Sequence, residues 1–144
     1  MDINLKLFNL IKNHNYEDIY NILKSEDVID VNVRDESNNY IIQYAILYNK
    51  INLVSILIER ECKLDVLDSD NRSILYIPIK FGYLEILEIL LKNYENNIGL
   101  LLDDIKDNEG LYPIHYCIKF KNVKAINLFI KYNLNFNKFD NDND

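Results

Sequence analysis

Apolar residues recur along the chain with the period of an amphipathic helix, and each such segment follows a shorter apolar run. Two clear examples are Leu53, Ile56 and Leu57, and then Ile86, Ile89 and Leu90. A stripe with the spacing i, i+3, i+4 covers one face of a helix and leaves the other face polar. Asn49 and Gly82 stand just before these stripes, and both residue types tolerate the left-handed backbone that ends a helix. The pattern therefore predicts pairs of short helices joined by tight breaks.

Aspartates mark the start of each helix pair at a nearly constant spacing. They are Asp35, Asp68, Asp107 and Asp140, separated by 33, 39 and 33 residues. Each of the first three is followed by Asn or Gly three positions later, and then by two apolar segments. A fixed period of this size indicates a stack of similar units, because one helical pair cannot bury its own apolar faces. We therefore expect an all-α solenoid of helix–turn–helix units joined by β-turn loops.

The repeated unit resembles the ankyrin repeat, which has 33 residues, one β-turn, two helices and a Thr-Pro-Leu-His-x-Ala signature. The best match to this signature follows Asp107, where Pro113, Ile114, His115 and Cys117 stand at the Pro, Leu, His and Ala positions. A repeat of this family ends in a Val-Asn pair, and the corresponding pairs here are Val31-Asn32 and Phe136-Asn137. The resemblance implies a single domain over residues 1–144. Its repeats would lie at about 1–34 (degenerate), 35–67, 68–106 with a six-residue insertion, and 107–139, with 140–144 as the start of a further repeat.

Departures from the family pattern change the expectation locally. Gln43 and Tyr76 stand where the family prefers His, so we expect these two turns to be held less firmly. Pro78 lies inside the first helix of its repeat and lacks an N–H, which predicts a short or bent helix. The six extra residues fall around 94–104, where Asn96, Asn97 and Gly99 favour a loop and residues 100–102 indicate that part of it packs.

Composition narrows the possible partners. With a net charge of −7, the 144-residue chain lacks the positive surface that a nucleic-acid binder needs. We see neither a signal peptide nor an apolar run long enough to span a bilayer, so we expect an intracellular, cytoplasmic protein with no membrane partner. Cys62 and Cys117 are interpreted as reduced, buried thiols. Asn, Ile, Lys and Tyr are abundant and Arg is rare, which indicates an AT-rich genome such as that of a large DNA virus, some protists or some intracellular bacteria.

The sequence holds no recognisable set of catalytic or metal-binding residues. His14 and His115 are the only histidines, and neither has a metal-ligand spacing with a cysteine. Residues 140–144 resemble the start of a calcium loop but lack its glycine and its closing glutamate. We therefore expect no enzyme, no cofactor and no metal site.

The resemblance does imply a binding surface, formed by the turns and by the inward positions of the first helices. Those positions are Glu36, Ser37, Asp70, Arg72 and Glu109 in the turns, and Leu47, Tyr48, Lys80, Phe81, Lys119 and Phe120 in the helices. Tyr48, Phe81 and Phe120 occupy the same place in three repeats, so stacking would bring their rings into one row beside the two lysines. Rings of this kind often anchor protein interfaces. The alternative is that they fold over their own helices and fill gaps between repeats.

We therefore expect a non-catalytic protein–protein interaction module, monomeric, whose partner could be a host protein. Two other functions stay open: a structural spacer or capping segment without a specific partner, and the arm of an enzyme whose catalytic domain lies beyond residue 144. The second helix of the last repeat is not a polar cap, and residues 140–144 look like the turn that begins a repeat. This favours the N-terminal part of a longer protein over a natural end with an acidic tail.

Overall fold

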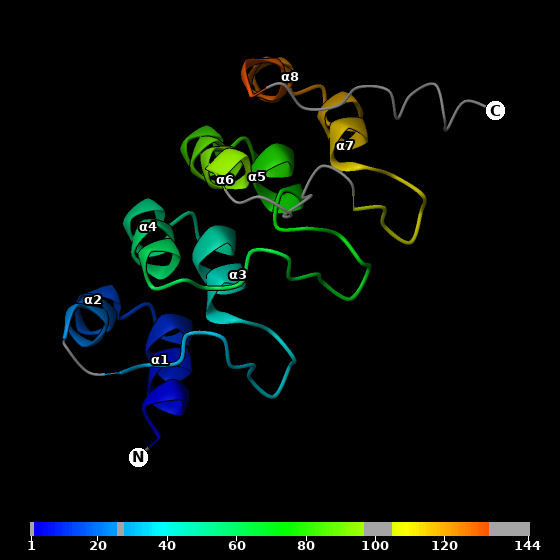
Figure 1. Ribbon diagram of the computed structural model, residues 1–144. Coiled ribbons are helices and arrows are strands. Elements are labelled where there is room, and N and C mark those ends of the chain that lie inside the picture. Colours follow the sequence, from blue (N-terminus) through cyan, green and yellow to red (C-terminus); the bar gives the residue numbers. More distant parts are fainter. Residues whose placement is uncertain (1, 26–27, 97–104, 133–144) are drawn as a thin grey trace. The chain divides into compact units, whose positions relative to one another are not determined.

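The computed structural model describes residues 2–25, 28–96 and 105–132, and in these ranges the regular elements are helices. They belong to two units, of which unit 1 is Met1–Lys63 and unit 2 is Leu64–Asp144. Unit 1 contains α1 (Ile3–Lys12), α2 (Tyr16–Lys24), α3 (Ile41–Leu47) and α4 (Ile51–Glu59), and unit 2 contains α5 (Tyr76–Phe81), α6 (Leu84–Asn96), α7 (Pro113–Lys119) and α8 (Val123–Lys131) (Figure 1). The predicted all-α arrangement of helical pairs is confirmed.

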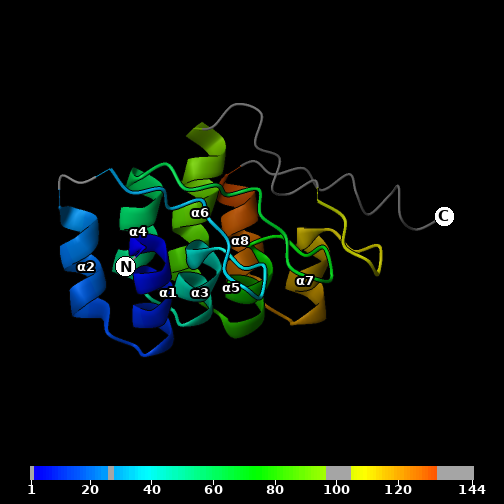
Figure 2. The same cartoon turned by 90° about the horizontal axis from the view of Figure 1, so that it is seen from below.

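Each helical pair turns on one residue with left-handed backbone geometry. These residues are His14, Asn49, Gly82 and Lys121, with φ of 57°, 56°, 72° and 54°. A side chain in this conformation carries a steric cost that glycine avoids and asparagine partly offsets. Figure 2 shows the two helices on either side of each turn lying next to one another. The breaks predicted at Asn49 and Gly82 are therefore present, and His14 and Lys121 serve the same purpose in the other two pairs.

In unit 1, polar side chains fasten the second hairpin to the first. The guanidinium of Arg60, at the end of α4, donates hydrogen bonds to the carbonyl oxygens of Leu23 and, at 2.7 Å, Ser25. These carbonyls lie at the C-terminal end of α2, where the backbone N–H groups of the helix no longer reach. Asn32 accepts from the Lys63 N–H at 2.7 Å and donates to the Glu61 carbonyl at 3.3 Å. Beneath these bonds lies an apolar core that includes Ile11, Ile19, Leu23, Leu53 and Leu57.

Unit 2 repeats this arrangement with different residues. Asn122 caps α8 by accepting from the Ala125 N–H at 3.0 Å, and its amide donates to the Ile79 carbonyl of α5 at 2.9 Å. At the other end of α8, Lys131 pairs with Glu88 of α6 at 2.6 Å. Hydrogen bonds from Lys131 and from Tyr132 lower the pKa of Glu88. The two hairpins of unit 2 are therefore joined at both ends of α8.

One of the two turns that lack the family histidine has an equivalent hydrogen bond. Gln43 Oε1 accepts from the Tyr40 N–H at 2.8 Å, just as His115 Nδ1 accepts from the Tyr112 N–H at 2.9 Å. The glutamine therefore places an acceptor where the histidine has one, and the expectation that this turn is held less firmly stays a prediction.

Pro78 and the insertion also differ in detail from what the sequence predicts. Helix α5 is short, as predicted, but it begins at Tyr76, so Pro78 lies in its first turn, where an N–H has no helical partner. Helix α6 continues through Asn96 and has 13 residues, whereas α4 and α8 have 9. Tyr94 and Asn96 are thus helical and not in a loop. The predicted packing of residues 100–102 and the pattern at 136–144 fall outside the described residues.

Candidate interaction surface

Each of the three turns is closed by its own aspartate. The backbone N–H of Asp35, Asp68 and Asp107 donates to the carbonyl four residues later, at 2.9 to 3.0 Å. One carboxylate oxygen of each aspartate also accepts two N–H groups of the same turn, at 2.8 to 3.0 Å. An aspartate can hold a turn in this way because its side chain is short enough to accept hydrogen bonds from the backbone N–H groups of the residues that follow it. The recurring aspartate therefore fixes the shape of the turns that carry Glu36, Ser37, Asp70 and Glu109, residues predicted to contact a partner.

The second carboxylate oxygen of the aspartate links the turn to the first helix. Tyr116 donates its hydroxyl to Asp107 Oδ2 at 2.9 Å, and Tyr44 donates to Asp35 Oδ2. Burial raises the pKa of both hydroxyls, and the neighbouring carboxylate raises it further. Both tyrosines therefore stay protonated as donors, and each one ties a turn to the helix that follows it.

The middle turn uses an arginine for the same purpose. Residue 77, nine places after Asp68, is isoleucine, and Arg72 Nε donates instead to Asp68 Oδ2 at 2.7 Å. The guanidinium lies 3.8 Å from the ring centroid of Tyr76 and 3.4 Å from Asp70 Oδ2. Burial lowers the pKa of Arg72, but the hydrogen bond to Asp68 and the electrostatic attraction of Asp68, Tyr76 and Asp70 together outweigh it, so the net pKa is raised. Arg72 is therefore held by the turn and the ring together.

At the end of α5, a lysine lies among three aromatic rings. The Lys80 ammonium is 5.4 Å from the ring centroid of Phe81, 5.7 Å from that of Tyr76 and 6.0 Å from that of Phe120. Phe120 in turn packs edge-on against Tyr76, with centroids 5.8 Å apart. We call Tyr76, Lys80, Phe81, Lys119 and Phe120 the Lys80 cluster. It joins the first helices of two successive hairpins within unit 2.

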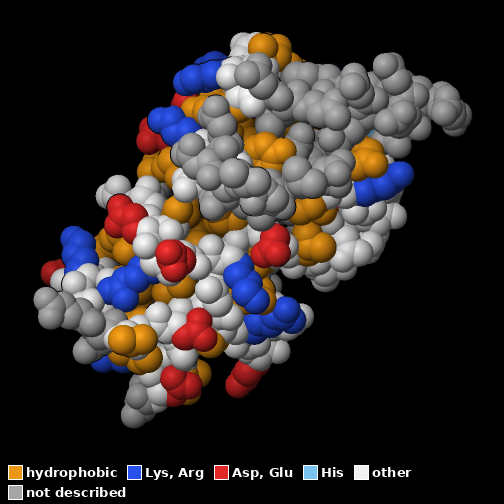
Figure 3. Space-filling view, in the orientation of Figure 1, with side chains coloured by type: hydrophobic (Ala, Val, Ile, Leu, Met, Phe, Trp, Pro, Cys, Tyr) orange, Lys and Arg blue, Asp and Glu red, His pale blue; other side chains and the backbone are white. Residues whose placement is uncertain are grey.

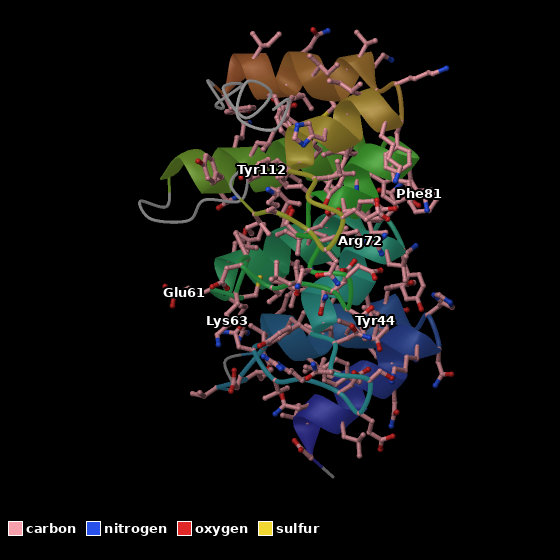
Figure 4. All side chains as sticks on the ribbon, turned by 90° about the vertical axis from the view of Figure 1, so that its right-hand side faces the viewer. Tyr44, Glu61, Lys63, Arg72, Phe81 and Tyr112 are labelled. Atoms are coloured by element: carbon pink, nitrogen blue, oxygen red, sulfur yellow. The ribbon has the colours of Figure 1, made fainter. Side chains whose placement is uncertain are left out.

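The outer members of the Lys80 cluster are accessible. Phe81 is 52% exposed, stacks on Tyr83 at 5.7 Å, and lies at the margin of the structure in Figure 4. Lys119 is 3.7 Å from Glu109, but no ion pair of Lys80 is found among the described residues. An ammonium near ring faces and without a carboxylate can still receive an acidic group from a partner. The cluster therefore offers apolar area and an available positive charge side by side.

Unit 1 has a related but more closed arrangement. Tyr48 packs edge-on against His14 at 4.8 Å and stacks on Tyr44 at 6.3 Å, which leaves it half-buried. Lys12 pairs with Asp35 Oδ2 at 3.0 Å and lies 5.6 Å from the Tyr44 ring. The hydrogen bond to Asp35 is the main cause that raises the pKa of Lys12. Lys12 therefore has a carboxylate partner in unit 1, whereas within the described ranges Lys80 has none.

The residues predicted to form the binding surface fall into an exposed group and a half-buried group. Glu36, Ser37, Leu47, Asp70, Lys80, Phe81, Glu109 and Lys119 are exposed, whereas Tyr48, Arg72 and Phe120 are half-buried. Phe81 and Phe120 meet around Lys80 within unit 2. Tyr48 belongs to unit 1, so a row through all three rings stays a prediction. Tyr48 and Phe120 also take part in packing, as the alternative interpretation expects.

Sequence reasoning missed the tyrosines at the base of this surface. Tyr44, Tyr76 and Tyr116 hold the turns or support the rings, but a tyrosine in a helix is usually interpreted as core. The available signal is the nine-residue spacing from Asp35 to Tyr44 and from Asp107 to Tyr116. A single Asp-to-Tyr interval of this length is common in proteins, but its recurrence at the same place in two repeats indicates that the two side chains contact each other.

Other chemistry is sparse in the described part of the chain. Burial raises the pKa of the Cys62 and Cys117 thiols to about 12, so both are protonated near neutral pH. Across residues 2–25, 28–96 and 105–132, no three His, Cys, Asp or Glu side chains are grouped closely enough to hold a metal ion. No helix in these ranges combines the length and apolar character needed to cross a membrane.

Four helical pairs, three of them led by an aspartate-closed turn, pack two by two through buried side chains within each unit, and this arrangement defines a helical-repeat protein. The family model for ankyrin repeats (three copies) matches residues 7–100. The chain belongs to the ankyrin-repeat family. It is 39% identical over 140 residues to an ankyrin repeat protein of Acanthamoeba polyphaga mimivirus, covering 96% of this chain and 18% of that protein. It is 26% identical over 87 residues to an ankyrin repeat protein of fowlpox virus, covering 60% of this chain and 56% of the relative.

These two relatives both come from large DNA viruses, in keeping with the AT-rich codon usage inferred from the sequence. The chain spans only 18% and 56% of their respective lengths. Ankyrin repeats in general are protein-interaction modules without catalytic activity of their own.

Proposed function

We propose that this chain is a non-catalytic interaction module that binds another protein through its turn tips and the ends of its first helices. Its main anchor is the Lys80 cluster, and the partner could be a host protein. We further propose that residues 1–144 form one domain with four repeats, of which the first lacks an aspartate turn, and with residues 140–144 as the start of a further repeat. The observation that supports the binding role most directly is the exposure of Phe81 beside the Lys80 ammonium, which forms no ion pair with the residues that the structure describes.

The Lys80 cluster suits binding better than the other exposed apolar residues do. An aromatic side chain buries a large area with few rotatable bonds, and a neighbouring cation adds attraction for a carboxylate. Lys80 is also held in place, because the rings of Tyr76 and Phe120 lie beside its ammonium, and Phe81 stacks on Tyr83. A surface that is ordered before binding loses less entropy in the complex. Figure 3 shows acidic and basic side chains interspersed with apolar ones over the face of unit 1 that this view presents.

The experiment is a comparison of partners recovered by three forms of the chain. Tagged wild-type chain, Phe81→Ala and Leu5→Ala are used as baits in extracts of a candidate host, and bound proteins are identified by mass spectrometry. Leu5 is 51% exposed, and Leu5→Ala therefore serves as the matched control for loss of an exposed apolar side chain. A protein that wild type and Leu5→Ala recover and Phe81→Ala does not supports the proposal. A set of proteins that is the same for all three baits contradicts it.

A further inference from the structure

A small polar pocket opens beside the Lys80 cluster, between the turns that begin at Asp68 and Asp107. Its volume is about 100 Å³, and the residues that line it include Asp70, Arg72, Tyr76, Asn108, Glu109 and Lys119. The two turns are joined to each other, because the Asn108 N–H donates to the Asp70 carbonyl at 3.0 Å and Asn71 Nδ2 donates to Asn108 Oδ1 at 2.7 Å. A pocket of this size is too small for a whole ligand and suits the head group of one side chain.

Arg72 supplies a fixed positive charge in this pocket. Its Nε donates to Asp68 at 2.7 Å, and its guanidinium lies 3.8 Å from the centroid of the Tyr76 ring. Among the described residues, no hydrogen bond of its Nη1 is found. The equivalent positions in the other two turns hold Asn39 and Leu111, so this charge belongs to one pocket and not to the repeat pattern.

The acidic groups at the pocket are held less firmly than Arg72. Asp70 Oδ2 is 3.4 Å from Arg72 and Glu109 Oε2 is 3.7 Å from Lys119, and the two acidic side chains are 61% and 72% exposed. Exposed ion pairs of this kind contribute little to stability. Asp107 also lines the pocket, but both of its oxygens already accept hydrogen bonds. An incoming anion therefore meets a guanidinium already in place and can displace two loosely held carboxylates, whereas an incoming cation would meet a fixed charge of its own sign.

The pocket is continuous with the apolar part of the Lys80 cluster. The Tyr76 ring contacts Arg72 and lies 5.7 Å from the Lys80 ammonium, which in turn is 5.4 Å from the Phe81 ring. Lys119 belongs to both sites, since it lines the pocket and its ammonium is 5.7 Å from the Phe120 ring. A chain segment with one side chain in the pocket would therefore bring the neighbouring side chains to the exposed rings.

We propose that the protein partner presents an acidic side chain next to an apolar one, with the carboxylate bound by Arg72 and Lys119 and the apolar side chain on Phe81. This inference rests on the proposed function, because it names the chemistry of the partner that the Lys80 cluster binds. A planar guanidinium matches the geometry of a carboxylate better than an ammonium does. The net charge of −7 does not prevent this contact, because charges farther away than about 8 Å are largely screened at physiological salt.

A displayed library of short random peptides, selected on the immobilised 144-residue chain, supplies the probe for a test. The most enriched peptide is synthesised, and fluorescence anisotropy gives its Kd for wild type, Lys119→Gln and Lys124→Gln. Lys119→Gln removes a charge at the pocket and leaves the contacts of Arg72 with Asp68 and Tyr76 in place. Lys124→Gln is the matched control, because Lys124 is an exposed lysine of the same hairpin and lies on α8, outside the pocket.

We expect the enriched peptide to carry Asp or Glu next to an apolar residue. Its Kd should rise at least about threefold for Lys119→Gln and stay unchanged for Lys124→Gln. Replacing the acidic residue of the peptide by its amide should raise the Kd for wild type at least about tenfold. This replacement and Lys119→Gln should not be additive, because both remove the same contact.

Phe81→Ala separates a failure of this inference from a failure of the proposed function. A peptide that depends on Phe81 but has no acidic residue, or binds Lys119→Gln as tightly as wild type, would overturn the inference and leave the proposed function intact. Additive effects of the two charge changes would overturn it in the same way. A library that yields no peptide, or a peptide that binds Phe81→Ala as tightly as wild type, would contradict the proposed function and the inference with it.

Discussion

Tyr116 donates its hydroxyl to the carboxylate of Asp107, nine residues earlier, at 2.9 Å, and it does so with only 1% of its surface exposed. The same carboxylate closes the turn through the N–H groups of Glu109 and Leu111. One aspartate therefore ties together a turn and the helix that follows, and the tyrosine supplies the donor that its second oxygen requires. This pair is the local reason why the turn keeps its position relative to the Lys80 cluster.

Removing only the hydroxyl of Tyr116 tests this link. Tyr116→Phe keeps the ring, which packs edge-on against Tyr76 at 5.0 Å, and leaves Asp107 Oδ2 without its donor. We expect a loss of about 1–3 kcal/mol in the free energy of unfolding, measured by urea denaturation. Tyr83→Phe is the control, because Tyr83 is half-exposed and its ring contact with Phe81 does not use the hydroxyl. Equal stability of the two variants would show that the Asp107 bond contributes nothing.

The ion pair of Asp35 with Lys12 predicts a dependence of stability on pH. Burial raises the pKa of Asp35, but hydrogen bonds from Tyr44, Asn39 and Lys12 outweigh this, and the net pKa is below its ordinary value of 3.8. A lowered carboxyl pKa stabilises the fold above the unfolded pKa and loses this effect as pH falls through the folded one. The pKa of Lys12 is raised above 10.5, so its contribution is present below that pH and is lost as pH rises further.

Urea unfolding of wild type and Asp35→Asn at several pH values checks this prediction. The wild type should be more stable near pH 7, and the difference should shrink once the pH falls below about 4, where the carboxylate becomes protonated. The difference should also shrink at alkaline pH, as the pH rises beyond the ordinary lysine pKa of 10.5 and Lys12 loses its proton. A difference that stays constant from acid to alkaline pH would contradict the assigned pKa shifts.

The two cysteines can report separately on the two units. Cys62 lies in unit 1 and Cys117 in unit 2, and burial raises the pKa of each thiol to about 12. At pH 8 about one thiol in ten thousand is then a thiolate, which is the reactive form. We expect a thiol reagent to label the native chain far more slowly than the chain in urea. Labelling of Cys62→Ala and Cys117→Ala at intermediate urea shows whether the units open together, and fast labelling without urea would refute the buried assignment.

Substitutions at two of the left-handed turn residues should change the stability of the fold in opposite directions. Gly82 has φ of 72°, and an added Cβ would meet no atom within 4 Å, so the cost of Gly82→Ala is that of the backbone alone. We expect a loss of about 1 kcal/mol. Lys121 has φ of 54° with a full side chain, so Lys121→Gly relieves this strain and should leave stability unchanged or raise it by up to about 1 kcal/mol. Thermal unfolding measures both, and a gain from Gly82→Ala would contradict the assignment.

Much of this fold follows from short-range sequence pattern. The helix pairs, the breaks at Asn49 and Gly82 and the aspartate turns are local features, and the repeat multiplies a signal that would be weak in a single unit. The bond made by Gln43 could not be foreseen from residue preference, because a different side chain delivers an acceptor to the same N–H. The sequence pattern places the end of α6 too early, since asparagine is common in loops but does not by itself stop a helix.

The candidate surface is less accessible to sequence reasoning. The inward positions can be located in the sequence by counting from the aspartates. The exposure of their side chains cannot be predicted in this way, because it depends on which neighbouring residue covers each ring. Phe81 and Phe120 occupy the same place in successive repeats, and yet Phe120 packs on Tyr76 whereas Phe81 faces solvent. The role of Lys80 between the rings depends in the same way on contacts across two hairpins.

The central claim is that the Lys80 cluster binds a protein partner, and the affinity of Phe81→Ala for that partner tests it most directly. Once a partner is identified, titration calorimetry gives its Kd for wild type and Phe81→Ala, with Leu5→Ala as the control. Because Phe81 is exposed, the melting temperatures of the three chains should be closely similar. We predict that Kd rises about tenfold or more for Phe81→Ala and stays unchanged for Leu5→Ala. An unchanged Kd for a folded Phe81→Ala would contradict the account.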